Sequence, residues 1–467
     1  MAILHGLSPA PVARCRVLEV ACGDGANLIP MAYAIPAGEF VGFDLARLPI
    51  ERGQERIGEL GLKNVRLFQG DLLDVGAELG PFDYIIAHGL YAWAPQPVRD
   101  RLLWLCGDLL TADGVAFVSY NAKPGGYLRS MVRDLMLFGG KSSEDPEQEV
   151  VEGLKFVHFI AQALPENDVY RALLESQLQR MEKHNRAAIR HDELSDVYHP
   201  VHFAEFVEHA GKHGLQYLSE AQLPPPPDPC YRAEMQAALK SAGSEDVLLQ
   251  EQFLDFVRMR AYRETLLCRA DRAIQRGFPA EHFRRLLLAT QTSPASGEAP
   301  GASAFVLPGG IRMESNHPGV TALLRELGKA WPGAIAFEAL EPRLAESGFA
   351  LAQDGASWLI RLAVAKMIEL RAWNAPAAAS ISERPRASAC CRQEARSLKQ
   401  TTSLLHMTVS LEDDKVRSLL KLLDGTRGRL DLLEAMKAEF PAAPARELEE
   451  GLDPNLRLLH IAGILEG

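Results

Sequence analysis

The chain has 467 residues, of which 47% are hydrophobic and 24% charged, with a formal net charge of −11. This composition is typical of a globular protein with several domains, each long enough to bury its own core. The acidic balance excludes a general attraction to nucleic acid. No apolar run reaches the roughly 18–20 residues that a membrane-spanning helix needs, so no membrane association is expected.

The N-terminal stretch and the cysteines indicate a cytoplasmic protein. MAILHGLSPAPVARC lacks the charged region, long apolar core and cleavage site of a secretory signal. The seven cysteines show no paired spacing, although Cys390 and Cys391 are adjacent. This pattern favours reduced thiols over a disulfide framework or a zinc site.

Residues 1–126 alternate short apolar segments with helical ones. Between the expected strands lie helices expected at 50–61 and 96–110. Short β-branched strands separated by helices predict a parallel sheet covered on both faces, and therefore a Rossmann-like α/β domain. The strands are expected at 16–22, 39–45, 64–70, 82–88 and 114–121.

Helical patterns dominate the next part of the chain. Amphipathic spacing in DVYRALLESQLQRMEKH predicts a helical insertion over 127–190, a candidate region for dimerisation or substrate contact. Residues 191–221 are expected to return to the sheet through a helix and a short strand.

Two linkers divide the C-terminal half. The proline-rich QLPPPPDPC (222–230) opens a region, 222–292, that is expected to be a helical regulatory domain. After a linker at 292–303, residues 304–374 are expected to form an α/β domain. Residues 373–397 are a second linker or an extended crossing. Residues 398–467 have helix–turn–helix character, with the turn at Asp424 and Gly425.

The stretch VLEVACGDGANL has the form of a nucleotide-binding turn. An apolar strand ends at Glu19 and is followed by Gly23 and Gly25. A dinucleotide fingerprint has a third glycine where Asn27 and Leu28 stand here, and an acidic strand end would repel a pyrophosphate. S-adenosylmethionine (SAM) carries no phosphate. Glu19 can support its cationic side, while N–H groups near the helix start can bind its carboxylate.

Two further acidic residues favour SAM. Asp44 closes the second strand, where a carboxylate can accept both ribose hydroxyls of either cofactor. Asp71, in a Gly-Asp pair after the third strand, lies where an adenine amino group would be met, although a plain turn or capping role is the alternative. Acidic residues at three successive strand ends together predict a SAM site.

Several segments of the chain resemble one family. The chain is similar to the class I SAM-dependent methyltransferases with a methyltransferase regulatory domain, a group that includes the bacterial outer-membrane-protein lysine methyltransferases. The segments that carry this resemblance are EVACGDG, FDYIIAHGLYAWAP, VSYNAKPGG, HPVHFAEFVEHAGKHGLQYLSEA, YRETLLCR and LLKLLDGTRGR.

The resemblance implies a Rossmann-like sheet with a helical insertion, followed by α-rich, winged-helix-like C-terminal domains. It implies SAM as cofactor, S-adenosylhomocysteine as product, and a protein lysine as acceptor. Only 15 residues precede Arg16, where related chains carry several tens, so a more open pocket or a shortened form is expected. Ala21 replaces the usual first glycine of the motif. The expected cofactor residues are Glu19, Ala21, Gly23, Asp24, Gly25, Asn27, Asp44, Leu45, Asp71, Leu72 and His88.

The loop after the fourth strand, HGLYAW, holds the candidate catalytic residues. Methyl transfer depends mainly on alignment and on exclusion of water, and a lysine amine must first lose its proton. His88 is the candidate for orienting substrate or accepting a proton, or else bonds the loop backbone. Tyr91 and Trp93 line a lysine channel or pack the loop onto the insertion. Asn121 binds substrate, together with Tyr120, or caps its strand.

Other functions are weighed against this one. His202, His209 and His213 can share a helical face, but no HExxH-type pattern accompanies them, and no metal is expected. The basic KVRSLLKLLDGTRGR is flanked by acidic EDD and ELEEGLDP, which favours a protein contact over nucleic-acid binding. A small-molecule methyltransferase and a non-catalytic SAM-binding partner protein are the alternatives. A homodimer is a candidate assembly.

Overall fold

The computed structural model describes residues 1–467 except 142, 144, 184, 185, 224–230, 296–303, 308 and 346–350. The proline break and most of the 292–303 linker therefore lie outside the described residues. None of the described helices is long and apolar enough to cross a membrane.

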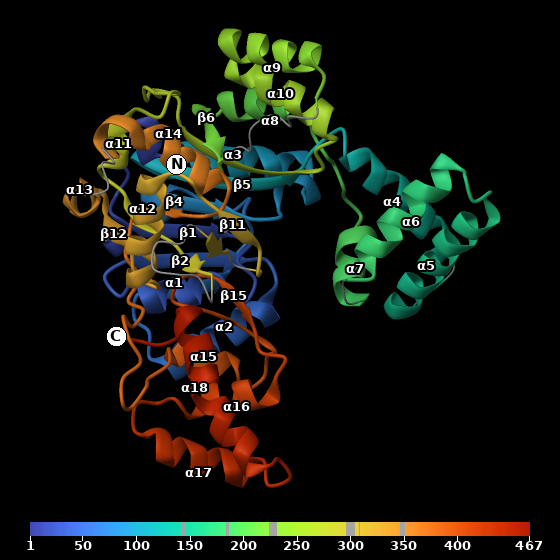
Figure 1. Ribbon diagram of the computed structural model, residues 1–467. Coiled ribbons are helices and arrows are strands. Elements are labelled where there is room, and N and C mark those ends of the chain that lie inside the picture. Colours follow the sequence, from blue (N-terminus) through green and yellow to red (C-terminus); the bar gives the residue numbers. More distant parts are fainter. Residues whose placement is uncertain are drawn as a thin grey trace.

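A seven-stranded sheet forms the centre of the molecule, with the strand order β3-β2-β1-β4-β5-β7-β6 (Figure 1). The first five strands are parallel, and the sequence-based strand positions are confirmed to within a few residues. The order reverses between β1 and β4, where the carboxyl ends of strands in such sheets form a ligand-binding crevice. These strands are β1 (Arg16–Val20), β2 (Glu39–Asp44), β3 (Val65–Gln69), β4 (Phe82–Ala87) and β5 (Leu110–Asn121).

The sixth and seventh strands of the sheet come from the region after the insertion. β6 (Leu215–Glu220) is the expected returning strand, whereas β7 (Tyr262–Arg269) lies in the region that was expected to be helical. β7 runs antiparallel to both β5 and β6, and only α9 (Ala233–Glu245) and α10 (Val247–Arg258) of the described 222–261 segment are helical. That expectation was wrong for β7 because the strand buries polar side chains, Arg263 and Thr265, which hide its apolar alternation.

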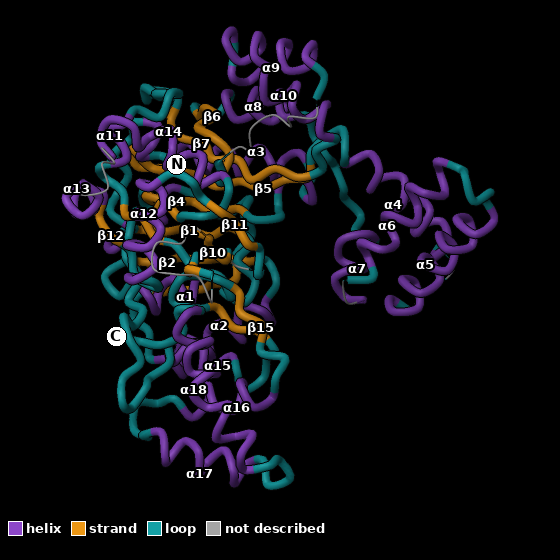
Figure 2. The backbone as a smooth tube through the Cα atoms, in the orientation of Figure 1, coloured by secondary structure: helices purple, strands orange, loops and turns teal. Residues whose placement is uncertain are grey.

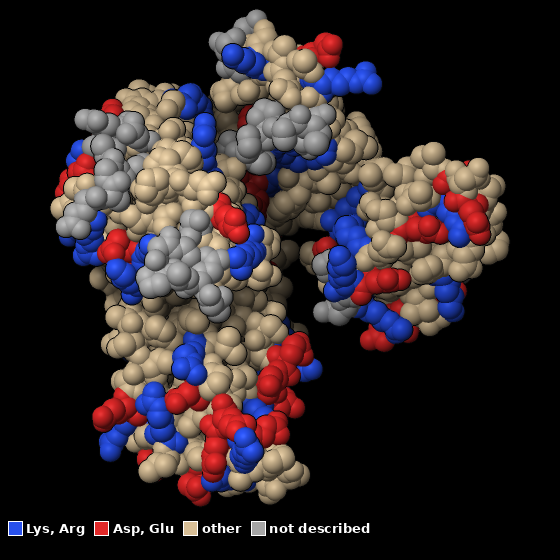
Figure 3. Space-filling model, in the orientation of Figure 1, with Lys and Arg blue, Asp and Glu red and all other residues tan. Residues whose placement is uncertain are grey.

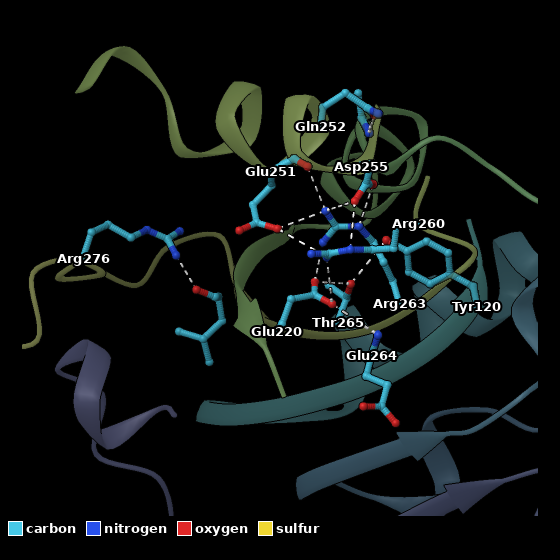
Figure 4. Close-up of polar contacts among 12 residues, drawn as sticks. Tyr120, Glu220, Glu251, Gln252, Asp255, Arg260, Arg263, Glu264, Thr265 and Arg276 are labelled. Atoms are coloured by element: carbon cyan, nitrogen blue, oxygen red, sulfur yellow. Dashed lines mark hydrogen bonds and ion pairs between the residues drawn. The ribbon is translucent and has the colours of Figure 1, made fainter. Parts of the chain in front are cut away.

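The buried arginine of β7 is compensated by a network of acidic groups (Figure 4). Arg263 bonds Glu220 of β6 at 2.6 Å, and Glu251 and Asp255 of α10 at 3.0 and 2.8 Å. Arg260 joins the same carboxylates, 3.1 Å from Asp255. These hydrogen-bonded ion pairs link β6 and β7, at the edge of the sheet, to α10.

Alternating side chains place the two faces of the sheet in different cores. Leu18, Val41 and Ile85 pack with α3 (Gln96–Leu109) and α8 (Phe203–Gly211). Their neighbours Val17, Phe40 and Tyr84 pack instead with α1 (Leu28–Ala34) and α2 (Arg47–Leu60). The second face also receives the N-terminal segment, since Ala2 and Leu7 cluster with Val115 and Leu218.

The insertion forms a helical arm that projects from the end of β5, away from the sheet (Figures 1 and 2). Its helices have a core of their own around Val132, Met136, Val157 and Leu174. Side-chain caps at Asp145 and Asp168 begin its second and third helices. The helices are α4 (Gly126–Gly140), α5 (Pro146–Ala163), α6 (Val169–Met181) and α7 (Arg186–Glu193).

The middle domain begins earlier than residue 304. β8 (Leu287–Ala289) pairs with β12 (Ile335–Ala336) and β13 (Glu369–Arg371), so residues before the linker share its core. The N-terminal Leu4 is buried in the same core. Its helices are α11 (Ala280–Phe283), α12 (Pro318–Ala330), α13 (Phe337–Ala345) and α14 (Leu351–Val364), beside a small sheet of β9 (Ser293–Pro294), β10 (Ala304–Val306) and β11 (Arg312–Glu314).

The C-terminal domain lies against α1 and α2 (Figure 1). Arg56 of α2 bonds Glu394 at 2.8 Å, and Gln393 bonds Glu59 at 2.7 Å. The predicted helix–turn–helix is present, with Gly425 in the turn at φ +85°. Its elements are α15 (Ala389–Glu394), β14 (Gln400–Thr402), β15 (Thr408–Ser410), α16 (Asp414–Leu422), α17 (Arg429–Glu439) and α18 (Ala445–Ile461).

Candidate functional site

The loop between β1 and α1 is built from residues with left-handed backbone. Ala21, Gly23 and Gly25 have φ values of 58°, 56° and 73°. Glycine adopts this conformation freely, whereas Ala21 does so at a cost of roughly 1 kcal/mol. Asp44 closes the loop, since its two carboxylate oxygens accept the N–H groups of Gly23 at 2.9 Å and Ala46 at 2.8 Å. The expected cofactor residues of β1 and β2 are therefore adjacent.

Glu19 is buried at the end of β1 and uses only part of its hydrogen-bonding capacity. Its Oε1 accepts a hydrogen bond from the Asn27 amide at 3.0 Å. Its Oε2 is buried without a hydrogen-bond partner among the described residues. Burial raises the pKa of this carboxyl to about 7. An unpaired buried carboxylate oxygen fits a cationic ligand group, which would satisfy it.

The remaining cofactor candidates have local roles as well. Asp71 accepts the Leu73 N–H at 2.9 Å, which is the turn role that the sequence left open. Asp24 accepts the Ala26 N–H at 3.2 Å within its own loop. Leu72 is buried and Leu45 is 68% exposed. Asp71 and Asp24 each engage one carboxylate oxygen in these bonds, so the other oxygen is available to a ligand.

His88 follows β4, on the other side of the crevice. Its Nδ1 lies 3.2 Å from the Ser119 hydroxyl and 3.5 Å from the Tyr262 hydroxyl. The Ser119 hydroxyl also accepts the Gly89 N–H at 2.8 Å, which ties the loop to β5. Since Nδ1 is engaged, Nε2 is the ring nitrogen left for a substrate.

The other catalytic candidates make packing contacts. Tyr91 is buried, its hydroxyl lies 2.8 Å from His209 Nδ1, and burial raises its pKa to about 12. The Trp93 ring packs at a tilt against Tyr198 at a centroid separation of 4.7 Å, with Arg129 over it at 4.9 Å. Trp93 thus packs the loop against the insertion, whereas Tyr91 packs it against α8.

Asn121 also has a structural partner. Its backbone carbonyl accepts the Val201 N–H at 3.2 Å, and the residue is 7% exposed. Its neighbour Tyr120 stacks on Phe206 and bonds the Thr265 hydroxyl at 3.2 Å. The Tyr120 side chain is thus held by packing, whereas the Asn121 bond involves only its backbone, so a substrate role for the Asn121 side chain stays a prediction.

Two of the three weighed histidines lie beside an aspartate. Donor atoms of Asp100, His209 and His213 come within 4.8 Å of one another. Both ring nitrogens of His209 already have partners, Tyr91 and, at 2.6 Å, Asp100. His202 instead precedes α8 as its N-cap residue. Asp100, His209 and Tyr91 thus form a chain of two hydrogen bonds that links α3, α8 and the loop after β4.

A largely apolar cavity of about 1160 Å³ opens beside the cofactor loop. Glu19, Asn27 and His88 line it, and so do Val17 and Phe117 of the sheet. Three other segments complete it: the N-terminal residues 1–4, the middle-domain residues 363–375 and the C-terminal residues 403–406. Sequence reasoning missed these segments, along with Ser119 and Tyr262, because no local motif marks them.

Comparisons with known proteins agree with this architecture. Residues 17–114 match the family model "Methyltransferase domain", residues 185–269 match "Predicted methyltransferase regulatory domain", and residues 383–444 match "PKMT, C-terminal winged helix domain". The fold is similar to that of PKMT2 from Rickettsia typhi, solved in complex with AdoHcy. The TM-score is 0.88 at 24% identity, covering 100% of this chain and 96% of that chain.

Two relatives come from Rickettsia prowazekii. Uncharacterized protein RP789 is 31% identical over 288 residues, which are 61% of this chain and 51% of the relative. Uncharacterized protein RP028 is 31% identical over 216 residues, which are 46% of this chain and 86% of the relative. The chain thus spans about half the length of RP789. It belongs to the class I methyltransferases that carry a methyltransferase regulatory domain and a PKMT-type winged-helix domain.

Proposed function

We propose that the protein transfers the methyl group of SAM to a protein side chain, with lysine as the acceptor. The observation that carries this proposal is the buried, partly unpaired carboxylate of Glu19 at the switch point of the sheet. Asp44 and Asp71 lie at the ends of the next two strands. These three carboxylates accept hydrogen bonds, which suits a ligand with a cationic end, ribose hydroxyls and an adenine amino group.

Different residues of the crevice bind different parts of SAM. Glu19 binds the cationic methionine end, and the missing side chain at Gly23, where an added Cβ would meet nothing within 4 Å, leaves room for the ligand beside the loop. Asp44 accepts the ribose hydroxyls at the second lone pair of each carboxylate oxygen, because one lone pair of each already accepts a backbone N–H. Asp71 accepts the adenine amino group. When bound, SAM supplies a methyl group activated by its sulfonium.

The protein's own contribution is to position and deprotonate the acceptor. The apolar cavity excludes water and lowers the pKa of an entering amine, because burial disfavours its charged form. His88 accepts the released proton through Nε2 while Ser119 holds Nδ1. Tyr262 supplies an aromatic ring beside His88, at a centroid separation of 6.4 Å.

A protein acceptor is supported by the PKMT name of both the winged-helix family and the structural neighbour. The winged-helix domain is proposed to contact protein rather than nucleic acid. Its basic side chains pair with acidic ones, as Lys415 does with Glu447 and Lys437 with Glu449, and both charges intermingle on the face in Figure 3.

The proposed assembly is a homodimer in the cytoplasm. The arm exposes Leu137, Phe138 and Phe159, which are 40%, 68% and 64% exposed, and a second copy would cover them. The described cysteines are free and buried, which suits a reducing compartment. Analytical ultracentrifugation of the parent chain is expected to show a dimer. The double variant with Phe138→Glu and Phe159→Glu is expected to be a monomer. A monomeric parent chain would contradict the assembly.

The test of the activity is incubation of the purified protein with methyl-labelled SAM and cell extract, followed by separation by size. The proposal predicts label in macromolecules with the parent chain and none with Asp44→Ala. Label in the small-molecule fraction would favour the small-molecule alternative. Binding of S-adenosylhomocysteine without any transfer would favour the regulatory alternative.

A further inference from the structure

The tip of the β14–β15 hairpin in the C-terminal domain reaches the cofactor loop. His406 lies in this tip, and its Nε2 donates to Asn27 Oδ1 at 2.7 Å. Asn27 is also the residue that bonds Glu19. A chain of two hydrogen bonds therefore joins the winged-helix domain to the buried carboxylate of the proposed SAM site.

The backbone of the hairpin tip holds His406 in place. His406 has a left-handed φ of 59°, and its N–H donates to the Ser403 carbonyl at 2.9 Å. The Leu404 N–H donates to the Gly463 carbonyl at 3.0 Å, which anchors the tip to the end of the domain. A strained residue held by its surroundings is typical of a position with a function beyond folding.

The contact fixes which atom of the Asn27 amide faces Glu19. The amide has one accepting oxygen and one donating nitrogen. His406 donates to the oxygen, so the nitrogen is directed to Glu19 Oε1 at 3.0 Å. In the opposite orientation the amide oxygen would face a carboxylate, and Glu19 would lose its donor.

The whole domain is clamped beside the loop. Arg56 bonds Glu394 at 2.8 Å, and the Tyr33 hydroxyl accepts the Ala389 N–H at 3.0 Å and contacts Glu466. Tyr33 and Arg56 belong to α1 and α2, the helices that flank the cofactor loop. The clamp keeps the hairpin tip within reach of Asn27.

We propose that His406 is a positioning residue of the SAM site, and that the winged-helix domain thereby completes the cofactor site of the methyltransferase domain. The inference rests on the proposed function, since it assigns a further residue to the same site. His406 acts through Asn27 on Glu19.

The pH dependence of ligand binding reports this role. The Asn27 hydrogen bond lowers the pKa of Glu19 against the larger effect of burial, so loss of the correctly oriented amide raises that pKa further. Glu19, Asp24 and Asp44 all lie close enough to Cys22 to act on its thiol. The other titratable groups of the cavity lining are the Met1 amino group, Cys15, Tyr84, His88, Lys366, Glu369, Arg371 and His406. The Glu19→Gln variant separates the titration of Glu19 from theirs.

The experiment is calorimetric titration with S-adenosylhomocysteine between about pH 6 and pH 8. His406→Gly removes the side chain and tolerates the left-handed φ, and it is expected to weaken binding about tenfold, as for one hydrogen bond. Its binding transition is expected to move to higher pH. His406→Gln, whose amide N–H can donate to Asn27, is expected to restore both. Lys399→Ala is the control, since the ion pair of Lys399 among the described residues is with exposed Glu412 of the same domain.

The outcomes separate the inference from the function on which it rests. If the parent chain fails to bind, the proposed function fails. If the parent binds and His406→Gly binds equally, the role of His406 is overturned. Asn27→Ala provides a second measure, because the His406→Gly change must have no further effect in its presence. Additive effects of the two changes would also overturn the inference.

Discussion

At the scale of single residues, the ionisation of Glu19 is the property that ligand binding should reveal. Burial raises its pKa to about 7, and the ammonium group of the ligand favours the ionised form. The affinity for S-adenosylhomocysteine is therefore expected to rise as the pH increases through 7. In Glu19→Gln this rise should be lost and the affinity should be lower throughout, as measured by calorimetry. An unchanged pH profile in Glu19→Gln would rule out this role.

The same shift has a consequence for the ligand-free protein. The folded-state pKa of Glu19 lies above the ordinary value of 4.5, so its stabilising contribution is present below pH 4.5 and is lost as the pH rises through about 7. Relative to Glu19→Gln, the parent chain is expected to lose on the order of 3 kcal/mol of unfolding free energy across this range. Denaturant unfolding at several pH values measures the difference.

His88 is the residue whose change should separate chemistry from cofactor binding. Because Nε2 is the nitrogen proposed to accept the proton of the acceptor, His88→Gln is expected to lower the transfer rate by roughly 10²-fold while S-adenosylhomocysteine affinity changes little. Ser119→Ala, which frees Nδ1, should have a smaller effect of the same kind. An equal loss of ligand affinity and rate would assign His88 to cofactor binding alone.

At the scale of elements, α2 supports the cofactor loop through a glycine. A Cβ added to Gly53 would lie 2.5 Å from the Asp24 carbonyl oxygen, too close for the backbone to stay in place. Gly53→Ala is therefore expected to displace the loop and weaken S-adenosylhomocysteine binding at least tenfold.

The same helix offers a matched control. A Cβ added to Gly58 would meet nothing within 4 Å. Gly58→Ala is expected to raise the free energy of unfolding by about 1 kcal/mol through helix propensity, with unchanged ligand affinity. Equal ligand affinities of the two variants would show that α2 does not set the position of the loop.

The joint between β7 and α10 depends on a buried charge network (Figure 4). Arg263→Met removes a cation that contacts Glu220, Glu251 and Asp255, and leaves their charges poorly compensated. The expected loss of unfolding free energy is about 3–5 kcal/mol. The exposed pair of Arg446 and Glu450 is the control, where Arg446→Ala should change little. Comparable stabilities of the two variants would mean that the network is not structurally important.

The sequence predicted those elements correctly whose residue pattern is local, such as a short apolar run that forms a strand. Apolar runs in the sequence predicted the strands β1 to β5. The positions of Glu19, Asp44 and Asp71 near the ends of these runs predicted acidic side chains at three strand ends. β7 was missed because its buried Arg263 is satisfied by carboxylates of two other elements, a partnership that no local pattern records. For Tyr91 the loop position left both a channel role and a packing role open, and its hydrogen bond to His209, 118 positions away, could not be predicted from a local pattern.

At the scale of the whole molecule, the cavity is formed by parts that are far apart in the chain. The N-terminal segment, the sheet, the middle domain and the winged-helix hairpin all contribute to its wall. His406 and Asn27 are 379 positions apart, and only the docked arrangement of domains brings them together. The sequence could therefore predict the cofactor class, but not the cavity wall that these distant segments form.

The most direct measurement of the central claim is a calorimetric titration of the purified chain with S-adenosylhomocysteine, repeated with Asp44→Ala. One site per chain with micromolar affinity is expected. Binding of S-adenosylhomocysteine is expected to weaken at least tenfold in Asp44→Ala, because the carboxylate that would accept the ribose hydroxyls is lost. Absence of binding to the parent chain, or equal affinity of the two proteins, would contradict the assignment of this crevice to SAM.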